Sequence, residues 1–507
     1  MKRPTLLAPA LLIPAAASAQ APAEAPSLDP PPAAVQSITG REIAGHLRFL
    51  ASDLLRGREA GTADARLAAE YLASNLTAIG AEPMGETGRD GKRSYFQRFM
   101  LEAATPQAEG AALTLTITYG QSRRKIACAL GSDYAYGPTG VVVGEIDAPA
   151  IFVGFGRVDA EKGVDDYAGK FAKGSFVLAY RGDPGENAAK VRAAAERGAL
   201  GVLLIAPPGG SPPPTPSPRD LGFGRPRVTL GPAPAEIPAF TLAAPIGESL
   251  AAALGLTAPD VSPPEADRNT KLGVHFAHAV RREPREDRNV VGFFPGSDPE
   301  KAKEVVVFSA HYDHEGVDEK GEIYNGSDDN GSGTSGILEV AQAFAAAPRP
   351  ARSVLFLWVS GEEKGLLGSK WFADHPTLPE GSRIVADINL DMISRNDPAK
   401  IGATPSPSLP DYNTLVVDAA EATRAEGLEM LFDTDPFYGR TDSYNFAAKG
   451  VPVIFFFAGL HEDYHKPTDD VEKADVEKAA RVARAAFRLG WKAAQAPEAP
   501  KKVRARP

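Results

Sequence analysis

The chain has 507 residues, of which 55 are basic and 65 acidic, so its formal net charge is −10. This length is enough for two to four domains with separate cores, and the acidic balance without clustered cations argues against nucleic-acid binding. The single cysteine, Cys128, excludes intramolecular disulfides, thiolate zinc sites and iron–sulfur clusters, so any metal would be held by His, Asp and Glu.

The first residues have the three parts of a secretory signal. Lys2 and Arg3 are positively charged, an apolar stretch follows, and the small-x-small pattern read by signal peptidase ends at Ala19. The apolar stretch is shorter than the roughly 20 residues that span a bilayer. We therefore expect residues 1–19 to be a signal peptide cleaved before Gln20, and the mature protein to be periplasmic or secreted without a stable membrane anchor.

Residues 20–111 contain an Ala/Pro-rich stretch followed by two predicted helices. Residues 20–36 are rich in Ala and Pro, which predicts a flexible leader. Apolar residues at helical spacing then predict two helices, over 43–55 and 65–79. These helices are assigned to 37–111, the first part of the larger domain.

From residue 112 the pattern turns to short β-type runs. Strands are predicted over 113–119, 150–154, 175–180 and 201–205, with one helix over 188–197. Residues 207–238 are rich in Pro and Gly, which indicates a long surface loop. We therefore expect 112–265 to form a β-rich module inserted into the larger domain.

After residue 289, apolar strands alternate with helices. Strands are predicted over 305–309, 353–359, 384–390 and 451–457, and a helix over 336–347. Such alternation indicates an α/β fold with a mixed, mostly parallel sheet sandwiched by helices. The main part of this domain is expected over 266–495, and a flexible tail over 496–507. In sheets of this kind, ligands bind beyond the carboxyl ends of the strands.

Acidic and histidine residues follow all four of these predicted strands. The groups are, in chain order, His311-Tyr312-Asp313, Gly361-Glu362-Glu363, Asp391 and Asp463-Tyr464-His465, with Ser327–Gly333 before the helix. Crowded carboxylates repel one another unless a cation compensates them. Carboxylates mixed with imidazoles suit zinc, with cobalt or manganese as substitutes. The sequence therefore predicts a metal site at this edge of the sheet.

The spacing within these groups suggests how such a site would work. Asp313 is placed to accept the second ring N–H of His311 and so to fix its tautomer. Two metal ions about 3.5–4 Å apart that share a carboxylate would activate water and polarise a carbonyl. The adjacent Glu362 and Glu363 point in different directions, so one can bind metal while the other transfers protons. Hydrolysis is the chemistry that this set favours.

Taken together, these residues resemble the zinc exopeptidase family that includes the secreted two-zinc bacterial aminopeptidases and the glutamate carboxypeptidases. The matching motifs, in the family's order, are His311-x-Asp313, Asp328–Gly333, Gly361-Glu362-Glu363, Asn389-Leu390-Asp391 and Asp463-Tyr464-His465. Residues 46–61 resemble the family's N-terminal helix, and 112–265 resembles a protease-associated (PA) domain. The resemblance implies a phosphorylase/hydrolase-like fold with an eight-stranded mixed sheet.

The family pattern also implies a role for each matched residue. One zinc would be bound by His311 and Glu363, the other by Asp391 and His465, and Asp329 would bridge the two. Glu362 would be the general base, and Asp313 would support His311 from behind. Asp329 is preferred to Asp328 for the bridge because it immediately precedes the Asn-Gly-Ser-Gly turn.

Other polar residues near the motifs have no ligand role in this interpretation. His314 and His461 are interpreted as loop residues. Tyr438 and Tyr464 are each compatible with a hydrogen bond to the oxyanion and with simple packing. Several relatives have a histidine where this chain has Ser443, so no role is carried over to that position.

Three functional hypotheses follow. The first is an exported two-zinc aminopeptidase that acts on peptide substrates. The second is a carboxypeptidase of the glutamate-releasing kind, which would need arginines such as Arg395 and Arg440 to clamp a terminal carboxylate. The third is a catalytically silent receptor on the same fold, against which the intact ligand set argues. The native metal, the preferred side chain, the role of the PA module and the oligomeric state stay open.

Overall fold

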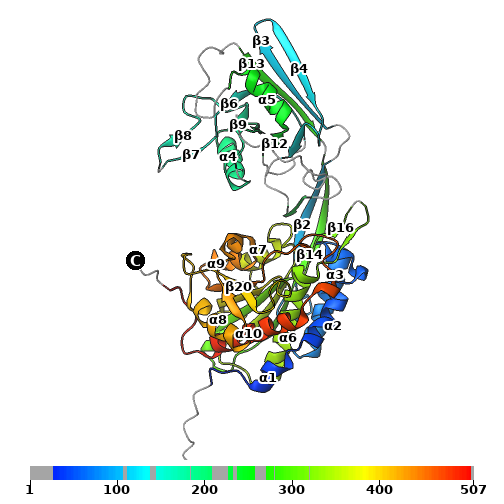
Figure 1. Cartoon of the computed structure of the whole chain (residues 1–507), viewed down its shortest axis with the longest axis vertical. Coiled ribbons are helices and arrows are strands. Elements are labelled where there is room, and N and C mark those ends of the chain that lie inside the picture. The colour runs from blue at the N-terminus through cyan, green and yellow to red at the C-terminus, as the bar shows by residue number, and fades with distance from the viewer. Residues whose placement is uncertain are drawn as a thin grey trace, which may run out of the picture.

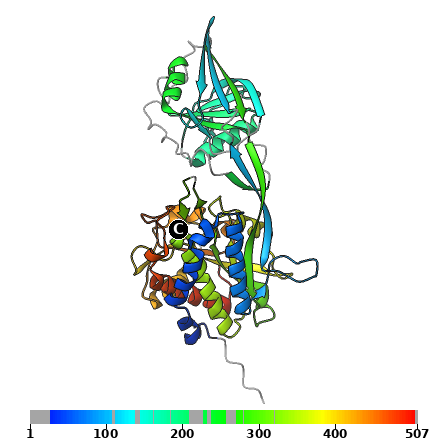
Figure 2. The same cartoon turned by 90° about the vertical axis from the view of Figure 1, so that its right-hand side faces the viewer.

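The computed structural model describes residues 27–106, 111–136, 144–160, 162–182, 184–207, 227–231, 237–256, 270–278, 280–318 and 320–503. The expected signal peptide lies outside these residues. Two lobes are joined by a long two-stranded ribbon made of β2 (Phe96–Pro106) and β14 (Val280–Phe294) (Figure 1). Figure 2 shows the same ribbon twisting between the lobes after a quarter turn.

The larger sheet contains ten strands among the described residues. Besides β2 and β14 they are β1 (Glu82–Pro83), β11 (Arg227–Leu230), β15 (Glu304–His311), β18 (Ser353–Val359), β19 (Arg383–Leu390), β20 (Lys400–Thr404), β21 (Glu429–Leu431) and β22 (Val453–Phe457). Their order is β11-β2-β14-β18-β15-β19-β22-β20-β21, with β1 beside β14. The central strands β18, β15, β19 and β22 are parallel to one another.

The outer strands make the sheet less parallel than expected. Every pair from β11 to β18 is antiparallel, and so is the pair of β20 with β22. The prediction of a mixed sheet is confirmed, but the sheet is not mostly parallel. It also exceeds the eight strands implied by the family resemblance, partly because β11 and the ribbon extend one edge.

Helices cover both faces of this sheet (Figure 1). On one face lie α1 (Pro32–Ser37), α2 (Gly40–Leu50), α3 (Ala63–Ala78), α6 (Gly333–Ala346), α8 (Thr414–Ala425) and α10 (Val476–Gln495); on the other lie α7 (Leu367–Asp374) and α9 (Ser443–Ala447). The predicted helix over 43–55 ends early, at Leu50, because Ser52 adopts an extended backbone before the turn η1 (Asp53–Arg58). None of the described helices is both long and apolar enough to cross a membrane.

The central strands are mostly apolar because both of their faces are buried, with Asp387 and Asn389 of β19 as buried polar exceptions. Every residue of β18 is buried. Phe356 stacks on Phe308 of the neighbouring strand, with ring centroids 5.2 Å apart, on the face covered by α6 and α10. Leu355 and Val307 pack in the core of the opposite face, with α7 and α9. This two-sided burial explains the continuous apolar runs that the sequence shows.

The leader and the tail are more ordered than expected. Helix α1 lies inside the predicted flexible leader, and its Ala34 and Val35 are buried in the main core. At the other end, the Val503 amide donates to the carbonyl of Tyr412 at 2.9 Å. The prediction of flexibility is therefore wrong for residues 32–36 and 496–503, because apolar contacts and backbone hydrogen bonds hold both segments against the larger lobe.

The second lobe is built on a separate sheet of eight strands among the described residues. They are β3 (Ala112–Tyr119), β4 (Ser122–Cys128), β5 (Tyr134–Tyr136), β6 (Gly144–Phe152), β9 (Phe176–Tyr180), β10 (Gly201–Ile205), β12 (Ala239–Leu242) and β13 (Thr270–His278). Their order is β4-β3-β13-β6-β9-β10-β12-β5. Two helices, α4 (Pro184–Glu196) and α5 (Ala244–Ala253), and the hairpin β7 (Val158–Asp159) with β8 (Val164–Asp165) complete the lobe.

The insert extends further along the chain than expected. Strand β13 follows residue 265, where the insert was expected to end, yet it pairs with β3 and β6 inside the second sheet. Its Leu272, Val274 and Phe276 are buried and alternate with more exposed residues, the pattern of a strand with one solvated face.

The Pro/Gly-rich stretch predicted as a surface loop contains a strand. Arg227–Leu230 forms β11, which pairs antiparallel with β2 in the larger sheet rather than in the second one. Val228 is buried beside Phe99 and Leu101. Because four residues are too few to show clear alternation, the sequence pattern did not indicate this strand. The neighbouring residues 208–226 and 232–236 lie outside the described part of the chain.

Helix α10 approaches the sheet most closely at Gly490, where a Cβ atom would overlap the ring of the buried Phe308. In an open helical position, Gly→Ala stabilises by roughly 1 kcal/mol. For Gly490→Ala we expect the opposite sign, a loss of about 1–3 kcal/mol in the free energy of unfolding, because the core is overpacked. Thermal unfolding followed by calorimetry measures this change.

The matched control is Gly45→Ala in α2, where nothing lies within 4 Å of the added Cβ atom. That variant should unfold at a slightly higher temperature than the wild type. An equal gain in both variants would contradict the close contact between α10 and β15.

Candidate metal centre

The five predicted ligands converge beyond the carboxyl ends of the central strands. His311 is the last residue of β15, and Asp391 directly follows β19. Glu363 lies in the loop after β18, and His465 in the loop after β22. Asp329 lies in η4 (Ser327–Ser332), the turn that begins α6. The parallel order of these strands therefore gathers residues that are far apart in the sequence.

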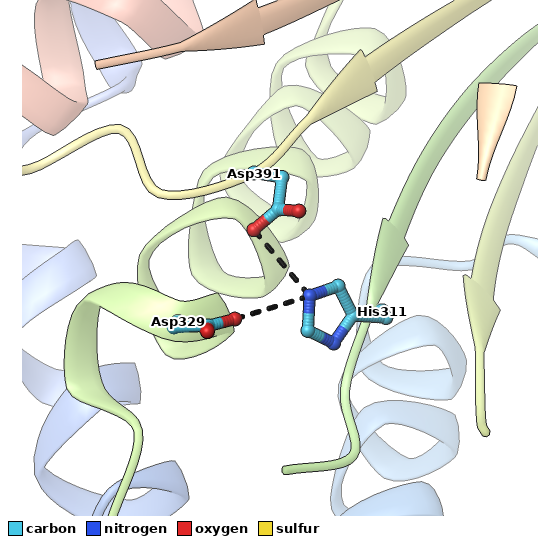
Figure 3. Close-up of side chains that lie close together, drawn as sticks. All are labelled: His311, Asp329 and Asp391. Atoms are coloured by element: carbon cyan, nitrogen blue, oxygen red, sulfur yellow. Dashed lines mark ion pairs between the residues drawn. The ribbon is translucent and has the colours of Figure 1, made fainter. Parts of the chain in front are cut away.

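Asp329 lies between two histidines. Its Oδ1 is 3.3 Å from Nε2 of His311, and its Oδ2 is 3.1 Å from Nε2 of His465. Asp391 Oδ1 lies 3.4 Å from the same nitrogen of His311, and Figure 3 shows both carboxylates directed at this ring. Glu363 Oε2 lies 3.0 Å from Nε2 of His465. The structure therefore forms two ligand groups that share Asp329.

The expected pairing of the other four ligands is wrong. His311 lies with Asp391 rather than with Glu363, and His465 lies with Glu363 rather than with Asp391. The reason is strand order: β15 and β19 are hydrogen-bonded neighbours, so the residues at their ends meet.

Glycines allow Asp329 to approach Asp391. A Cβ atom on Gly333 would overlap the carbonyl oxygen of Leu390, the last residue of β19. Asn330 ties the same two segments together, since its Nδ2 donates to that carbonyl at 3.0 Å and its Oδ1 accepts from the Gly333 amide at 2.9 Å. The Asp-Asn-Gly-Ser-Gly run is thus explained by the close contact between the start of α6 and the end of β19.

The donor atoms have the properties of metal ligands. Nε2 of His311 and Oδ1 of Asp391 are buried without a hydrogen-bond partner among the described residues. Leaving such atoms unpaired is costly, and a bound cation would compensate them. Each group offers imidazole nitrogen and carboxylate oxygen. Ligand atoms of His311, Asp329 and Asp391 lie within 4.8 Å of one another. In the other group, Nε2 of His465 lies 3.1 Å from Asp329 and 3.0 Å from Glu363. This donor set fits zinc.

The two adjacent glutamates have opposite electrostatic surroundings. Burial raises the pKa of Glu362 well above its usual range. His311 lowers this pKa, and the nearby Glu363 carboxylate raises it further. Burial acts in the same direction on Glu363, but His314 and His465 outweigh it and hold the pKa of Glu363 well below its usual range. Burial alone would lower the pKa of His465, whereas its bonds to Asp329 and Glu363 raise it to about 10.

Asp313 contacts the site differently from the prediction. Nδ1 of His311 lies 3.2 Å from the backbone carbonyl oxygen of Asp313 and 3.8 Å from its carboxylate. The ring N–H therefore donates to the main chain, which fixes the tautomer in place of the carboxylate. The Asp313 carboxylate instead accepts from the backbone N–H of Glu362 at 3.2 Å.

The interpretation of His314 as a loop residue missed its place in the site. Its side chain is fully buried, and its Nδ1 lies 2.7 Å from Oε1 of Glu363. Glu315 also reaches the site, with Oε1 at 3.6 Å from Nδ1 of His465. Their position directly after Asp313 was the only signal, because nothing in the spacing distinguishes them from other loop residues.

His461 supports Asp328 rather than a ligand group. The Asp463 amide donates to Nδ1 of His461 at 3.2 Å, so Nε2 carries the proton and faces Oδ2 of Asp328 at 3.3 Å. Asp328 Oδ1 accepts from the backbone and the hydroxyl of Ser394. These contacts hold Asp328 away from the two ligand groups, in agreement with the choice of Asp329.

An open cleft of about 360 Å³ borders the ligand groups. Four carboxylates are among its lining residues: Asp329, Glu362, Glu363 and Asp391. Its apolar lining residues are Leu366, Met392, Phe437, Phe455, Phe457 and Leu460. Tyr464 also lines the cleft, with its ring stacked on His465, whereas Tyr438 is buried and donates to Asp411. Arg440 lines the cleft, while Arg395 is paired with Asp463 at 2.8 Å.

This fold and this donor set are those of an α/β protein with a candidate metal site at the carboxyl edge of its sheet. Residues 289–489 match peptidase family M28. This matched segment contains all five ligand candidates, in line with the predicted resemblance to the zinc exopeptidases.

The chain also matches curated relatives over part of its length. It is 29% identical over 197 residues to a probable leucine aminopeptidase of Trichophyton verrucosum, a match that covers 37% of this chain and 53% of the relative. It is 30% identical over 186 residues to aminopeptidase YwaD of Bacillus subtilis, covering 35% of this chain and 38% of the relative. The chain thus spans about half or less of the length of these relatives.

The fold also has a solved counterpart. The structure of an aminopeptidase from Aneurinibacillus sp. strain AM-1 is similar with a TM-score of 0.62 at 23% identity. The likeness covers 93% of this chain and 97% of that chain, so both lobes take part in it. It establishes the shared architecture.

Proposed function

We propose that the protein is an exported zinc aminopeptidase that releases N-terminal residues from peptides. The observation that carries the proposal is the position of Asp329 between two histidine–carboxylate pairs, with Glu362 beside them in an open cleft. The match of residues 289–489 to peptidase family M28 and the names of the relatives support the same reaction class. The proposal that the protein is exported rests on the signal pattern of residues 1–19. The identification of the second lobe as a PA domain rests on sequence resemblance.

The protein side chains divide the work of hydrolysis. His311 with Asp391, and Glu363 with His465, would each hold a zinc ion together with the shared Asp329. Zinc bound there supplies Lewis-acid chemistry, because it makes water more acidic and polarises a carbonyl oxygen. Glu362 acts as the general base, since it lines the cleft and is not held by either ligand group. Its carboxylate takes a proton from the attacking water and delivers it to the leaving amine nitrogen.

The cleft also accounts for recognition of the substrate's first residue. The carboxylates that line the cleft attract a free ammonium group, and no blocked amine would offer the same charge. Met392, Phe455 and Phe457, which also line the cleft, form a buried apolar cluster. A substrate with an apolar first side chain is therefore favoured, in keeping with the relatives named as leucine aminopeptidases.

The second candidate function is a carboxypeptidase, and the observation that favours it is the position of Arg440. It lines the cleft and could pair with a terminal carboxylate. Arg395, the other arginine considered for this role, is engaged by Asp463 at 2.8 Å and lies 3.9 Å from Asp469. One available arginine gives weaker support than the carboxylates that line the cleft give to binding of an ammonium.

N-acetylation of a good peptide substrate is expected to reduce kcat/KM by about 10²-fold or more, because an ammonium–carboxylate pair in a partly buried site is lost. The measurement compares free and acetylated forms of the same peptide, with product sequencing to locate the cleaved bond. A peptide with an amidated C-terminus serves as the control and should be cleaved normally. Equal rates on free and acetylated peptides, with failure on the amidated one, would favour the carboxypeptidase.

A further inference from the structure

Strand β14 connects the second lobe directly to the catalytic loops. It starts at Val280, two residues after the end of β13 in the second sheet. It ends at Phe294, between β2 and β18 of the larger sheet (Figure 1). Where it enters the larger lobe, Asp287, Arg288 and Asn289 contact the loops that follow β15 and β18. The loop after β15 directly follows His311, and the loop after β18 carries the two glutamates.

Asp287 makes the strongest of these contacts. Its side chain is fully buried, and its Oδ2 accepts hydrogen bonds from the hydroxyl of Ser360 at 2.7 Å and from the Gly61 amide at 2.8 Å. Its Oδ1 accepts from the backbone N–H of Arg288 at 2.8 Å. Both oxygens of the Asp287 carboxylate therefore accept hydrogen bonds. The donors are two backbone amides and the hydroxyl of Ser360.

The turn held by Ser360 leads directly into the proposed base. The Ser360 amide also donates to Oδ1 of Asn289 at 3.3 Å. Gly361 follows with a left-handed φ of 79°, and the next residue is Glu362, whose own amide donates to Asp313 at 3.2 Å. The backbone of Glu362 is thus fixed from both sides, by Asp313 and by the contacts of β14 with Ser360.

We propose that Asp287 is a positioning residue for the general base: through Ser360 it sets the backbone from which the Glu362 side chain enters the cleft. The inference rests on the proposed role of Glu362. A displacement of about 1 Å at a reacting group can cost 10²-fold in rate, so a hydrogen bond two residues away from the base matters for kcat.

Asp287→Asn tests the proposal with little change of shape. One oxygen of the carboxylate becomes an NH2 group, so at least one of the three donors around it faces another donor. We expect kcat to fall by about 10–10²-fold, with KM and metal content within about twofold of the wild type. Ser360→Ala removes the same hydrogen bond from the other end and should lower kcat in the same way.

The decisive measurement repeats Asp287→Asn in a Glu362→Gln background. If Asp287 acts through Glu362, it should change the residual kcat by less than about threefold there, because coupled positions are not additive. Asp387→Asn is the matched control, since Asp387 is also fully buried and accepts from a serine, Ser309, at 2.8 Å. Its effect on kcat should be the same factor in both backgrounds.

The possible failures can be told apart. A wild-type kcat for Glu362→Gln alone would overturn the proposed base, and with it the inference. If Glu362→Gln shows the expected low residual kcat, the inference about Asp287 alone is overturned by an unchanged kcat in Asp287→Asn, by loss of metal, or by an equal loss in both backgrounds. Should Asp287→Asn fail to fold, Ser360→Ala provides the same comparison.

Discussion

Replacement of Glu362 by glutamine is expected to lower kcat by about 10²–10⁴-fold while metal content and fold are unchanged. Glutamine keeps the size of the side chain but has no basic oxygen. Glu362 belongs to neither ligand group, and its Oε2 lies 3.9 Å from Nε2 of His311. Steady-state kinetics together with elemental analysis of the purified variant measure both quantities.

Glu363→Gln is the matched comparison, one residue further along the chain. Oε1 of Glu363 lies 2.7 Å from His314 and Oε2 lies 3.0 Å from His465, so this carboxylate is surrounded by the second ligand group. A neutral amide should weaken metal binding there and lower activity through metal loss. Excess zinc should therefore partly restore the Glu363 variant and leave the Glu362 variant inactive. The reverse pattern would show that base and ligand are exchanged.

Removal of metal with a chelator is expected to abolish hydrolysis and to lower the unfolding temperature. Activity is lost because the carbonyl and the attacking water are no longer activated. Stability is lost because a ligand that binds only the folded state contributes about 4 kcal/mol when present at a thousand times its dissociation constant. Zinc or cobalt added back should restore both properties, as activity assays and calorimetry can show.

The Glu362→Gln variant separates these two effects. It should be inactive with or without metal, yet its unfolding temperature should fall on chelation as much as that of the wild type. Unchanged turnover in wild-type protein after verified metal removal would contradict the mechanism. An unchanged unfolding temperature would instead contradict the burial of the ligand groups.

The sequence predicted the central part of the fold because two-sided burial leaves a clear pattern. The runs of β15, β18, β19 and β22 are mostly apolar, and each leads within a few residues to acidic or histidine residues. That pattern was sufficient to bring the five ligand candidates to one edge of a sheet. It could not give the order of the strands, which is decided by long-range packing, and the ligands were therefore paired wrongly.

The residues that the sequence did not predict depend on contacts between distant segments. His314 contacts Glu363, which lies in the loop after β18. Asp287 accepts a hydrogen bond from Ser360 in the same loop. In the sequence, each is a polar residue without distinctive spacing. The strands β13 and β11 were missed for another reason: their assignment depends on which sheet they join rather than on their own composition.

The short strand β11 has a consequence for the solubility of the larger lobe. It covers the outer edge of β2, a strand of 11 residues whose backbone groups would otherwise be open on that side. Unpaired edges of long strands invite pairing with a second chain, which leads to aggregation. Because β11 is supplied from within the insert, the larger lobe cut free of that insert would lose the cover over its own sheet edge.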